Sequence, residues 1–126
     1  MSFALKNLPH RSAKPRSNGI TLVLDKGYSI RQVEDFVEVC SDHVDIVKLG
    51  WGTSYVTQGL EEKIKVYQNA GIPVYFGGTL FEAYLMRNQL SDYRKLMETY
   101  GITHVEVSNG TILLSDERKQ AIIREL

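Results

Sequence analysis

The chain has 126 residues, an ordinary length for one domain. Hydrophobic residues make up 43% of it and charged residues 24%, a balance typical of a protein with a packed core and not of a disordered chain. The 15 Lys and Arg residues balance the 15 Asp and Glu residues, so charge gives no reason to expect nucleic acid or an anionic membrane as a partner.

The cysteine content and the apolar runs bear on the compartment. The single Cys40 excludes an internal disulfide and a multi-cysteine metal site, and its place in an apolar helical stripe predicts a buried thiol. No apolar run approaches the ~20 residues of a membrane span. Residues 1–8 lack the apolar stretch and cleavage site of a secretory signal. We therefore expect a cytoplasmic protein with no membrane partner.

Residues 1–18 combine two prolines with several basic side chains and show no apolar periodicity. We interpret them as an N-terminal arm, which on composition alone would be a mobile basic tail. Residues 19–126 contain no linker or break in composition. They repeat one pattern, a short apolar run, a polar or glycine-rich turn and a helical pattern, at about 30 residues per unit. The four runs predict strands at 20–25, 44–49, 72–76 and 102–108.

Helix signals follow each run. Ser29 with Gln32 forms a capping-box pattern before the first helix, and the second helix is predicted over 60–70. Thr79 with Glu82 forms a second capping-box pattern. That helix is expected to run through Leu85, break near Asn88 and resume over 91–100, and Ser115 is expected to cap the last helix.

Side chains alternate along a strand, so each run has two faces. We assign Leu22 and Leu24 to an aliphatic face under helices, and Asp25 to the opposite face together with Lys48 and Glu106. Alternating strands and helices imply a parallel sheet. An inner face that becomes polar toward the strand ends favours a TIM-type (β/α) barrel over an open doubly wound sheet. Four units supply half of an eight-stranded barrel.

Asp25, Lys48 and Glu106 are expected at three strand ends, and two readings stay open. They could form an ion-pair network, because unpaired buried charges are costly. Alternatively, they could bind an anionic substrate, with the carboxylates Asp25 and Glu106 holding Mg²⁺ through oxygen ligands.

Three loops offer groups for ligands. Gly77-Gly78-Thr79 joins a strand to a helix, where backbone N–H groups attract anions, although a tight turn explains it equally well. In the stretch Gly50-Trp51-Gly52-Thr53, the indole could wall a pocket or plug the barrel. Ser108-Asn109-Gly110 offers a hydroxyl and an amide, or a simple turn.

In their order and spacing, these stretches resemble the phosphosulfolactate synthase family. The resemblance covers nearly the whole chain and is carried by Leu24-Asp25-Lys26-Gly27, Asp45-Ile46-Val47-Lys48-Leu49-Gly50-Trp51-Gly52-Thr53-Ser54, Phe76-Gly77-Gly78-Thr79-Leu80-Phe81-Glu82 and Val105-Glu106-Val107-Ser108-Asn109-Gly110.

The resemblance implies a TIM-barrel lyase that adds sulfite to phosphoenolpyruvate with Mg²⁺, giving (2R)-phospho-3-sulfolactate for coenzyme M or sulfolactate synthesis. It implies catalytic roles for Lys48 and Glu106, metal ligation by Asp25 and Glu106, and substrate contacts from the strand-end loops. A lysine in the family's second half, favoured as the proton donor, has no counterpart in this chain. The implied substrate-binding residues are Lys26, Trp51, Gly52, Thr53, Gly77, Gly78, Thr79, Ser108 and Asn109.

Three hypotheses follow. The chain is a synthase homologue, which could pair as a homo-oligomer to complete a barrel. The second hypothesis is that the chain is a truncated, non-catalytic half-barrel that serves as an assembly or binding module. A third hypothesis makes Lys48 the Schiff-base lysine of an aldolase.

Overall fold

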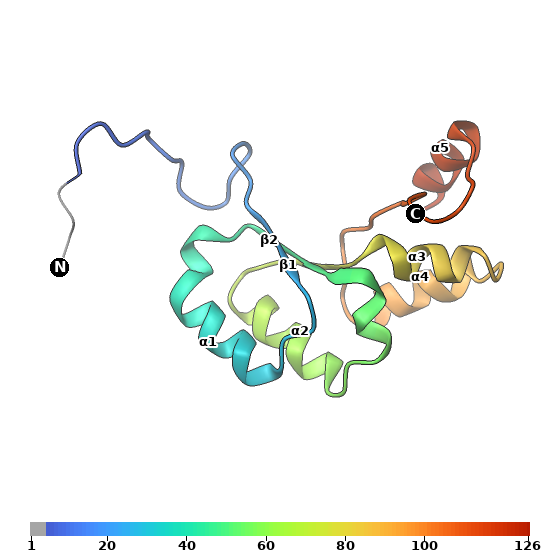
Figure 1. Ribbon diagram of the computed structural model, residues 1–126, viewed down its shortest axis with the longest axis horizontal. Helices are drawn as coiled ribbons and strands as arrows, with labels where there is room; N and C mark the ends of the chain where they lie inside the picture. The colour runs from blue at the N-terminus through green and yellow to red at the C-terminus, as the bar shows by residue number, and fades with distance from the viewer. Residues whose placement is uncertain (1–4) are drawn as a thin grey trace.

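The computed structural model describes residues 5–126, which contain one parallel β-sheet flanked by helices. Strands β1 (Leu22–Asp25), β2 (Ile46–Leu49) and β3 (Val74–Phe76) lie in the order β1-β2-β3. Because parallel neighbours need crossover connections, a helix follows each strand. The helices α1 (Ile30–Cys40) and α2 (Leu60–Asn69) pack side by side on one side of the sheet (Figure 1).

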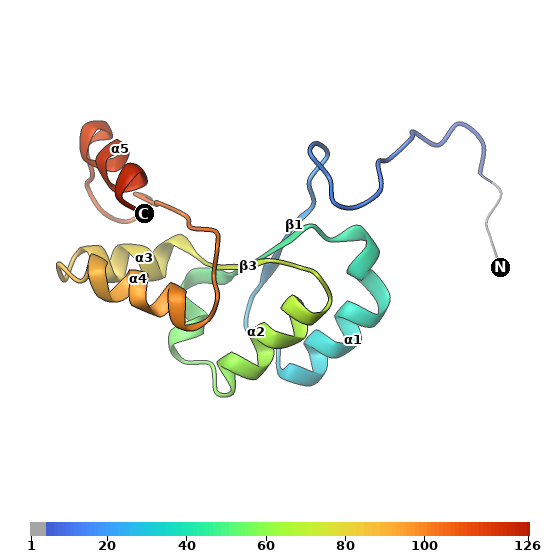
Figure 2. The same ribbon diagram turned by 180° about the vertical axis from the view of Figure 1, so that it is seen from behind.

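The other elements lie around this unit. Two short 3-10 helices, η1 (Ser41–His43) and η2 (Gly50–Tyr55), come before and after β2. The helices α3 (Gly78–Leu85) and α4 (Leu90–Thr99) pack against each other, whereas α5 (Asp116–Glu125) lies apart from α1 and α2 (Figure 2). No helix of residues 5–126 is long and apolar enough to cross a membrane.

The helix ends confirm most of the predicted signals. Ser29 and Gln32 form the expected capping box, and the Ser115 side chain accepts a hydrogen bond from the Arg118 amide. Asn88 has a φ of 56° at the break between α3 and α4. The second capping box is wrong: α3 begins at Gly78 without a side-chain cap, because Glu82 turns to the segment after residue 107.

The core lies between the sheet and its covering helices. Its aromatic side chains stack edge to face, with Phe76 and Tyr93 at 6.5 Å and Phe81 and Tyr93 at 5.7 Å between ring centroids. Such contacts add to the burial of apolar surface. Cys40 packs at the margin of this core and is only partly buried. Fully buried hydrophobic residues include Val33, Val47, Tyr67, Ile72, Phe76, Phe81, Tyr93 and Ile122.

The two faces of β1 are the reverse of the prediction. In the parallel ladder Leu24 lies opposite Lys48 and Asp25 lies opposite Leu49. Asp25 is fully buried on the helix-covered face, whereas Leu22 is half exposed on the other. The aliphatic face was assigned wrongly because the buried Asp25 carboxylate has partners on α2, which include Lys63.

The predicted fourth strand is also wrong. Residues 102–108 form no strand of the sheet, and the sheet of the described residues has three strands and no closed barrel. Side chains, and not a β-ladder, attach this segment to β2 and α3, through Glu106 and Ser108. The prediction failed because the alternation of side chains indicates only which face each residue of a segment occupies. It does not show that a neighbouring backbone is in place to pair with the segment.

The predicted arm at 1–18 is described only from residue 5, and residues 1–4 lie outside the described part. Residues 5–18 contain no helix or strand, but basic side chains attach them to the domain. Arg16 lies 2.7 Å from Asp45 and its side chain is 6% exposed, and Lys14 donates to the Ser41 carbonyl. The Thr21 amide, together with Arg16, lowers the pKa of Asp45. These contacts do not fit a freely mobile tail.

Candidate functional site

An ion pair between Lys48 and Glu106 lies at the end of the sheet. Lys48 projects from β2, and its Nζ lies 2.6 Å from Glu106 Oε2 and 2.9 Å from Oε1. The side chains are 24% and 33% exposed, so solvent and small ligands can reach both. The predicted meeting of these two residues is confirmed, and the pair offers an ammonium and a carboxylate side by side.

The amino terminus of α3 completes this cluster. The Gly78 amide donates to Glu106 Oε2 at 3.1 Å, so the carboxylate lies where a helix favours negative charge. A Cβ on Gly78 would lie 2.3 Å from the Ser108 Cβ, and one on Gly77 would lie 2.7 Å from the Leu49 carbonyl oxygen. Both glycines are therefore required by close chain packing.

Trp51 lies beside the cluster on a strained turn. Its φ of 49° is unusual for a bulky residue, and such strain is found more often at functional sites. Trp51 is 58% exposed, and the Lys26 ammonium lies 5.3 Å from its ring centroid. The Thr53 hydroxyl donates to the Gly50 carbonyl at 2.8 Å, which stabilises the turn. Trp51 is therefore an exposed side chain on a turn next to Gly77.

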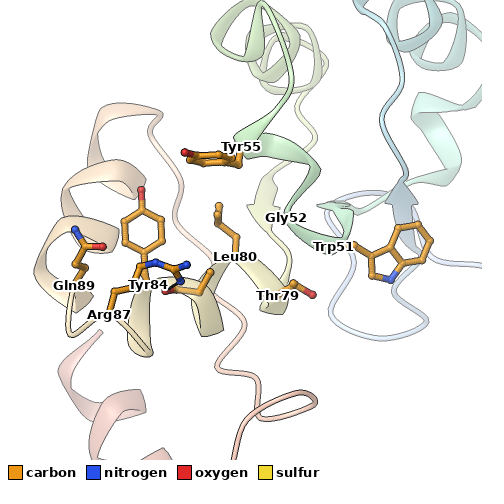
Figure 3. Close-up of a pocket in the computed structure, with 9 residues that line it drawn as sticks. Trp51, Gly52, Tyr55, Thr79, Leu80, Tyr84, Arg87 and Gln89 are labelled. Carbon is orange, nitrogen blue, oxygen red and sulfur yellow. Dashed lines mark hydrogen bonds between the residues drawn. The ribbon is translucent and has the colours of Figure 1, made fainter.

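A cavity of about 570 Å³ opens between η2 and α3. Figure 3 shows Tyr84, Arg87 and Gln89 gathered on one side of it, with the Trp51 ring turned away on the other. The cavity is thus lined both by predicted site residues and by aromatic and basic residues that the motifs did not indicate. Its lining residues are Trp51, Gly52, Tyr55, Thr79, Leu80, Ala83, Tyr84, Arg87 and Gln89.

Ser108 and Asn109 lie in a turn that α3 holds. The Ser108 hydroxyl donates to Glu82 Oε1, and the Asn109 side-chain oxygen accepts from Lys119 Nζ at 3.0 Å. Glu82 also accepts hydrogen bonds from Gly110 and Thr111. Burial alone would raise the pKa of Glu82, but the hydrogen bonds from Ser108, Thr111 and Gly110 outweigh it and lower that pKa.

Asp25 is separate from this cluster. Its carboxylate is fully buried and accepts hydrogen bonds from the Gly27 and Tyr28 amides, each at 2.8 Å. Lys63 Nζ lies 2.8 Å from Oδ2, and the Tyr67 hydroxyl donates to the same oxygen at 3.0 Å. Burial of the phenol, with Asp25 next to it, raises the pKa of Tyr67. Asp25 therefore anchors the loop after β1.

These environments allow a test of how well a divalent cation fits. Both oxygens of the Asp25 carboxylate already accept hydrogen bonds from protein donors, and one of these donors is the Lys63 ammonium. This environment does not favour Asp25 as a metal ligand. Glu106 is partly open and fits better, with Lys48 as a neighbour that a cation would displace. Residues 5–126 contain no group of three or more His, Cys, Asp or Glu residues arranged to hold a metal. A cation here would depend on substrate oxygens and water.

Sequence reasoning missed Lys63, Tyr67 and Glu82, all buried and all partners of polar groups. A signal for Lys63 existed, since it shares helical spacing with Leu60, Ile64 and Tyr67 and therefore lies on the apolar stripe of α2. A charged residue on such a stripe indicates a buried partner. No comparable signal indicated the lining residues Tyr84, Arg87 and Gln89, because their meeting depends on the angle between α3 and η2.

The fold and site define an α/β protein whose ionisable side chains gather where parallel strands end. A family model for (2R)-phospho-3-sulfolactate synthase (ComA) matches residues 9–126, and the chain belongs to this family. The "Phosphosulfolactate synthase" of Bacillus subtilis (strain 168) is 38% identical over 98% of this chain and 48% of its own length. That of Methanocaldococcus jannaschii is 45% identical over 84% of this chain and 43% of its own. The chain thus spans about half the length of these curated relatives.

Proposed function

We propose that this chain supplies the amino-terminal half of a phosphosulfolactate synthase site, at which sulfite adds to phosphoenolpyruvate to give (2R)-phospho-3-sulfolactate. The observation that carries the proposal is the partly exposed Lys48–Glu106 pair at the amino terminus of α3, in a member of this family. The β/α units would form half of a (β/α)8 barrel.

The proposed step is a conjugate addition. The sulfur lone pair of sulfite forms a bond to the methylene carbon of phosphoenolpyruvate, and the carbon–carbon double-bond electrons move toward the carboxylate. A proton then adds to the adjacent carbon, so that no bond to phosphate breaks. Lys48 and the α3 amide groups would stabilise the carboxylate and phosphate charges. Lys26, Trp51 and Thr79 would line the remainder of the substrate site.

Mg²⁺ is the proposed cofactor. Glu106 would hold it together with substrate oxygens, whereas Asp25 would support the loop that carries Lys26. When bound, the ion would supply positive charge for the developing enolate-like oxygen. In this proposal residues 5–126 bind and orient the substrate, and the proton donor is not assigned among them.

Consumption of phosphoenolpyruvate and sulfite by the purified chain, with and without Mg²⁺, tests the activity. The expected product carries a new carbon–sulfur bond, which mass spectrometry detects when labelled sulfite is supplied. The control variant is Lys65→Met, which removes an exposed lysine on α2 outside the site and should keep the activity of the unaltered chain. No product with the unaltered chain, under conditions in which it binds phosphoenolpyruvate, would exclude unaided catalysis.

A second candidate, a non-catalytic assembly module, is favoured by the half-exposed Leu22 on the uncovered face of the sheet. Pairing of two copies would cover this face and the sheet edges, which otherwise invite aggregation. Native mass spectrometry tests this pairing, and the activity assay above decides whether the paired chain is catalytic. A dimer is expected if the chain completes its own barrel as a homo-oligomer, and a stable monomer would exclude that route.

A further inference from the structure

Glu82 occupies an unusual position for a carboxylate. It lies on α3, is 2% exposed, and accepts hydrogen bonds from three residues that lie 26 to 29 positions later in the chain. The Gly110 and Thr111 amides donate at 2.8 and 3.0 Å, and the Ser108 and Thr111 hydroxyls donate as well. These contacts satisfy a buried charge with neutral donors alone.

The segment that Glu82 contacts needs an anchor. Residues 102–108 form no β-ladder, so backbone pairing does not hold them beside β3. Glu106 lies in this segment, two residues before Ser108, and its carboxylate must meet both Lys48 and the Gly78 amide. Val105 and Val107, on either side of Glu106, pack against the core, and the nearest polar contacts further along the chain are those of Ser108, Gly110 and Thr111 with Glu82.

We propose that Glu82 is a positioning residue that fixes the Ser108–Thr111 turn and, through it, sets Glu106 against Lys48 and the start of α3. The role of this arrangement in ligand binding rests on the proposed function. The Ser108 hydroxyl then serves as a donor to Glu82 and does not contact substrate. Asn109, in the turn, accepts a hydrogen bond from Lys119 of α5, and Glu106, two residues before the turn, is the group that reaches the site.

Backbone amide exchange followed by NMR tests the positioning without any ligand. Glu82→Gln is expected to speed exchange at Gly110 and Thr111 about tenfold or more, because their acceptor is weakened. It is also expected to speed exchange at Gly78, whose amide bonds to Glu106 and not to Glu82. The control Glu98→Gln removes an exposed carboxylate on α4 and should leave all three amides unchanged.

Unchanged exchange at Gly78 in a folded Glu82→Gln protein would overturn the proposal, since Glu82 would then hold only the turn. If that variant does not fold, Ser108→Ala keeps the Glu82 carboxylate and removes one donor. It should still speed Gly78 exchange by a smaller factor, and no change would again count against the proposal. Slower exchange at the α3 interior identifies the folded state in each sample.

Phosphoenolpyruvate titration of the same samples, with Mg²⁺ present, separates this proposal from the proposed function. Weaker binding by Glu82→Gln than by the unaltered chain is expected, and equal binding would contradict the link to ligand. If the unaltered chain does not bind phosphoenolpyruvate, the proposed function fails, while the Gly78 exchange still decides whether Glu82 positions Glu106.

Discussion

The Lys48 ammonium and the Glu106 carboxylate meet at 2.6 Å although 58 positions separate them in the chain. One comes from a strand and the other from a segment without regular structure. Because both side chains are partly exposed, water screens the pair and its contribution to stability is small. Its value lies instead in placing opposite charges at the start of α3, where a ligand anion or cation could replace one partner.

The first prediction concerns this pair. Lys48→Met should weaken phosphoenolpyruvate binding about tenfold or more, because a charge-assisted contact to the anion is lost. The same change should lower the free energy of unfolding by less than about 1 kcal/mol. Titration calorimetry and urea unfolding measure the two effects. Lys65→Met, which breaks an exposed pair with Glu61, is the control and should leave binding intact.

The second prediction concerns the buried pair of Asp25 and Lys63. Lys63→Met should lower the free energy of unfolding by about 3–5 kcal/mol, because it leaves the buried Asp25 carboxylate without its cation. Asp25→Asn should also destabilise, and the double variant should lose less than the sum of the two. Urea unfolding checks each value. Additive losses would show that the two side chains do not interact.

Asp25 also shows how far sequence reasoning reached. The strand end, the acidic residue and its place in the family motif were visible in the sequence. The face it occupies depended on a partner on α2, and alternation along a strand cannot reveal such a partner. The capping boxes show the same limit. Ser29 and Gln32 formed one from two neighbouring residues, whereas Glu82 accepts hydrogen bonds from a turn far along the chain.

Helices and the first three strands were predictable because their signals are local, such as caps and apolar periodicity. The run at 102–108 carried the same alternation but did not become a strand, because a ladder needs a neighbouring backbone. In the candidate site, the predicted contact between Lys48 and Glu106 formed. The cavity residues Arg87 and Gln89 were not foreseen, since their place depends on packing between elements.

The third prediction uses the lowered pKa of Glu82. Its ordinary value is 4.5, and the folded value is lower, so the charged carboxylate stabilises the folded state above the unfolded pKa. That stability is lost as the pH falls through the lower, folded pKa. The difference in unfolding free energy between the unaltered chain and Glu82→Gln should therefore be constant above about pH 5 and shrink below about pH 4.5.

Urea unfolding from neutral to acidic pH measures this difference. Glu98→Gln serves as the control and should differ little from the unaltered chain at any pH, because its carboxylate is exposed. A difference for Glu82→Gln that grows toward acidic pH would contradict the assigned direction of the shift.

The fourth prediction concerns the close contact between Gly78, at the start of α3, and Ser108. Gly78→Ala places a Cβ 2.3 Å from the Ser108 Cβ, so one chain must move. We expect a loss of about 1–3 kcal/mol in unfolding free energy, together with weaker phosphoenolpyruvate binding. Gly110→Ala is the matched control, because its nearest new contact would be 3.7 Å away. Equal effects of the two changes would argue against a close crossing at Gly78.

The fifth prediction uses Trp51, the only tryptophan in the chain, as a reporter. Trp51 is 58% exposed, and the centroid of its ring lies 5.3 Å from the Lys26 ammonium. Phosphoenolpyruvate that engages Lys26 should change the indole environment, so binding should alter Trp51 fluorescence in a saturable way. Lys26→Met removes the cation and should reduce both the signal change and the affinity, whereas Lys65→Met should leave both unchanged. A saturable signal of equal midpoint in Lys26→Met would place the ligand away from Lys26, and the substrate site would then lie toward Lys48 and the start of α3.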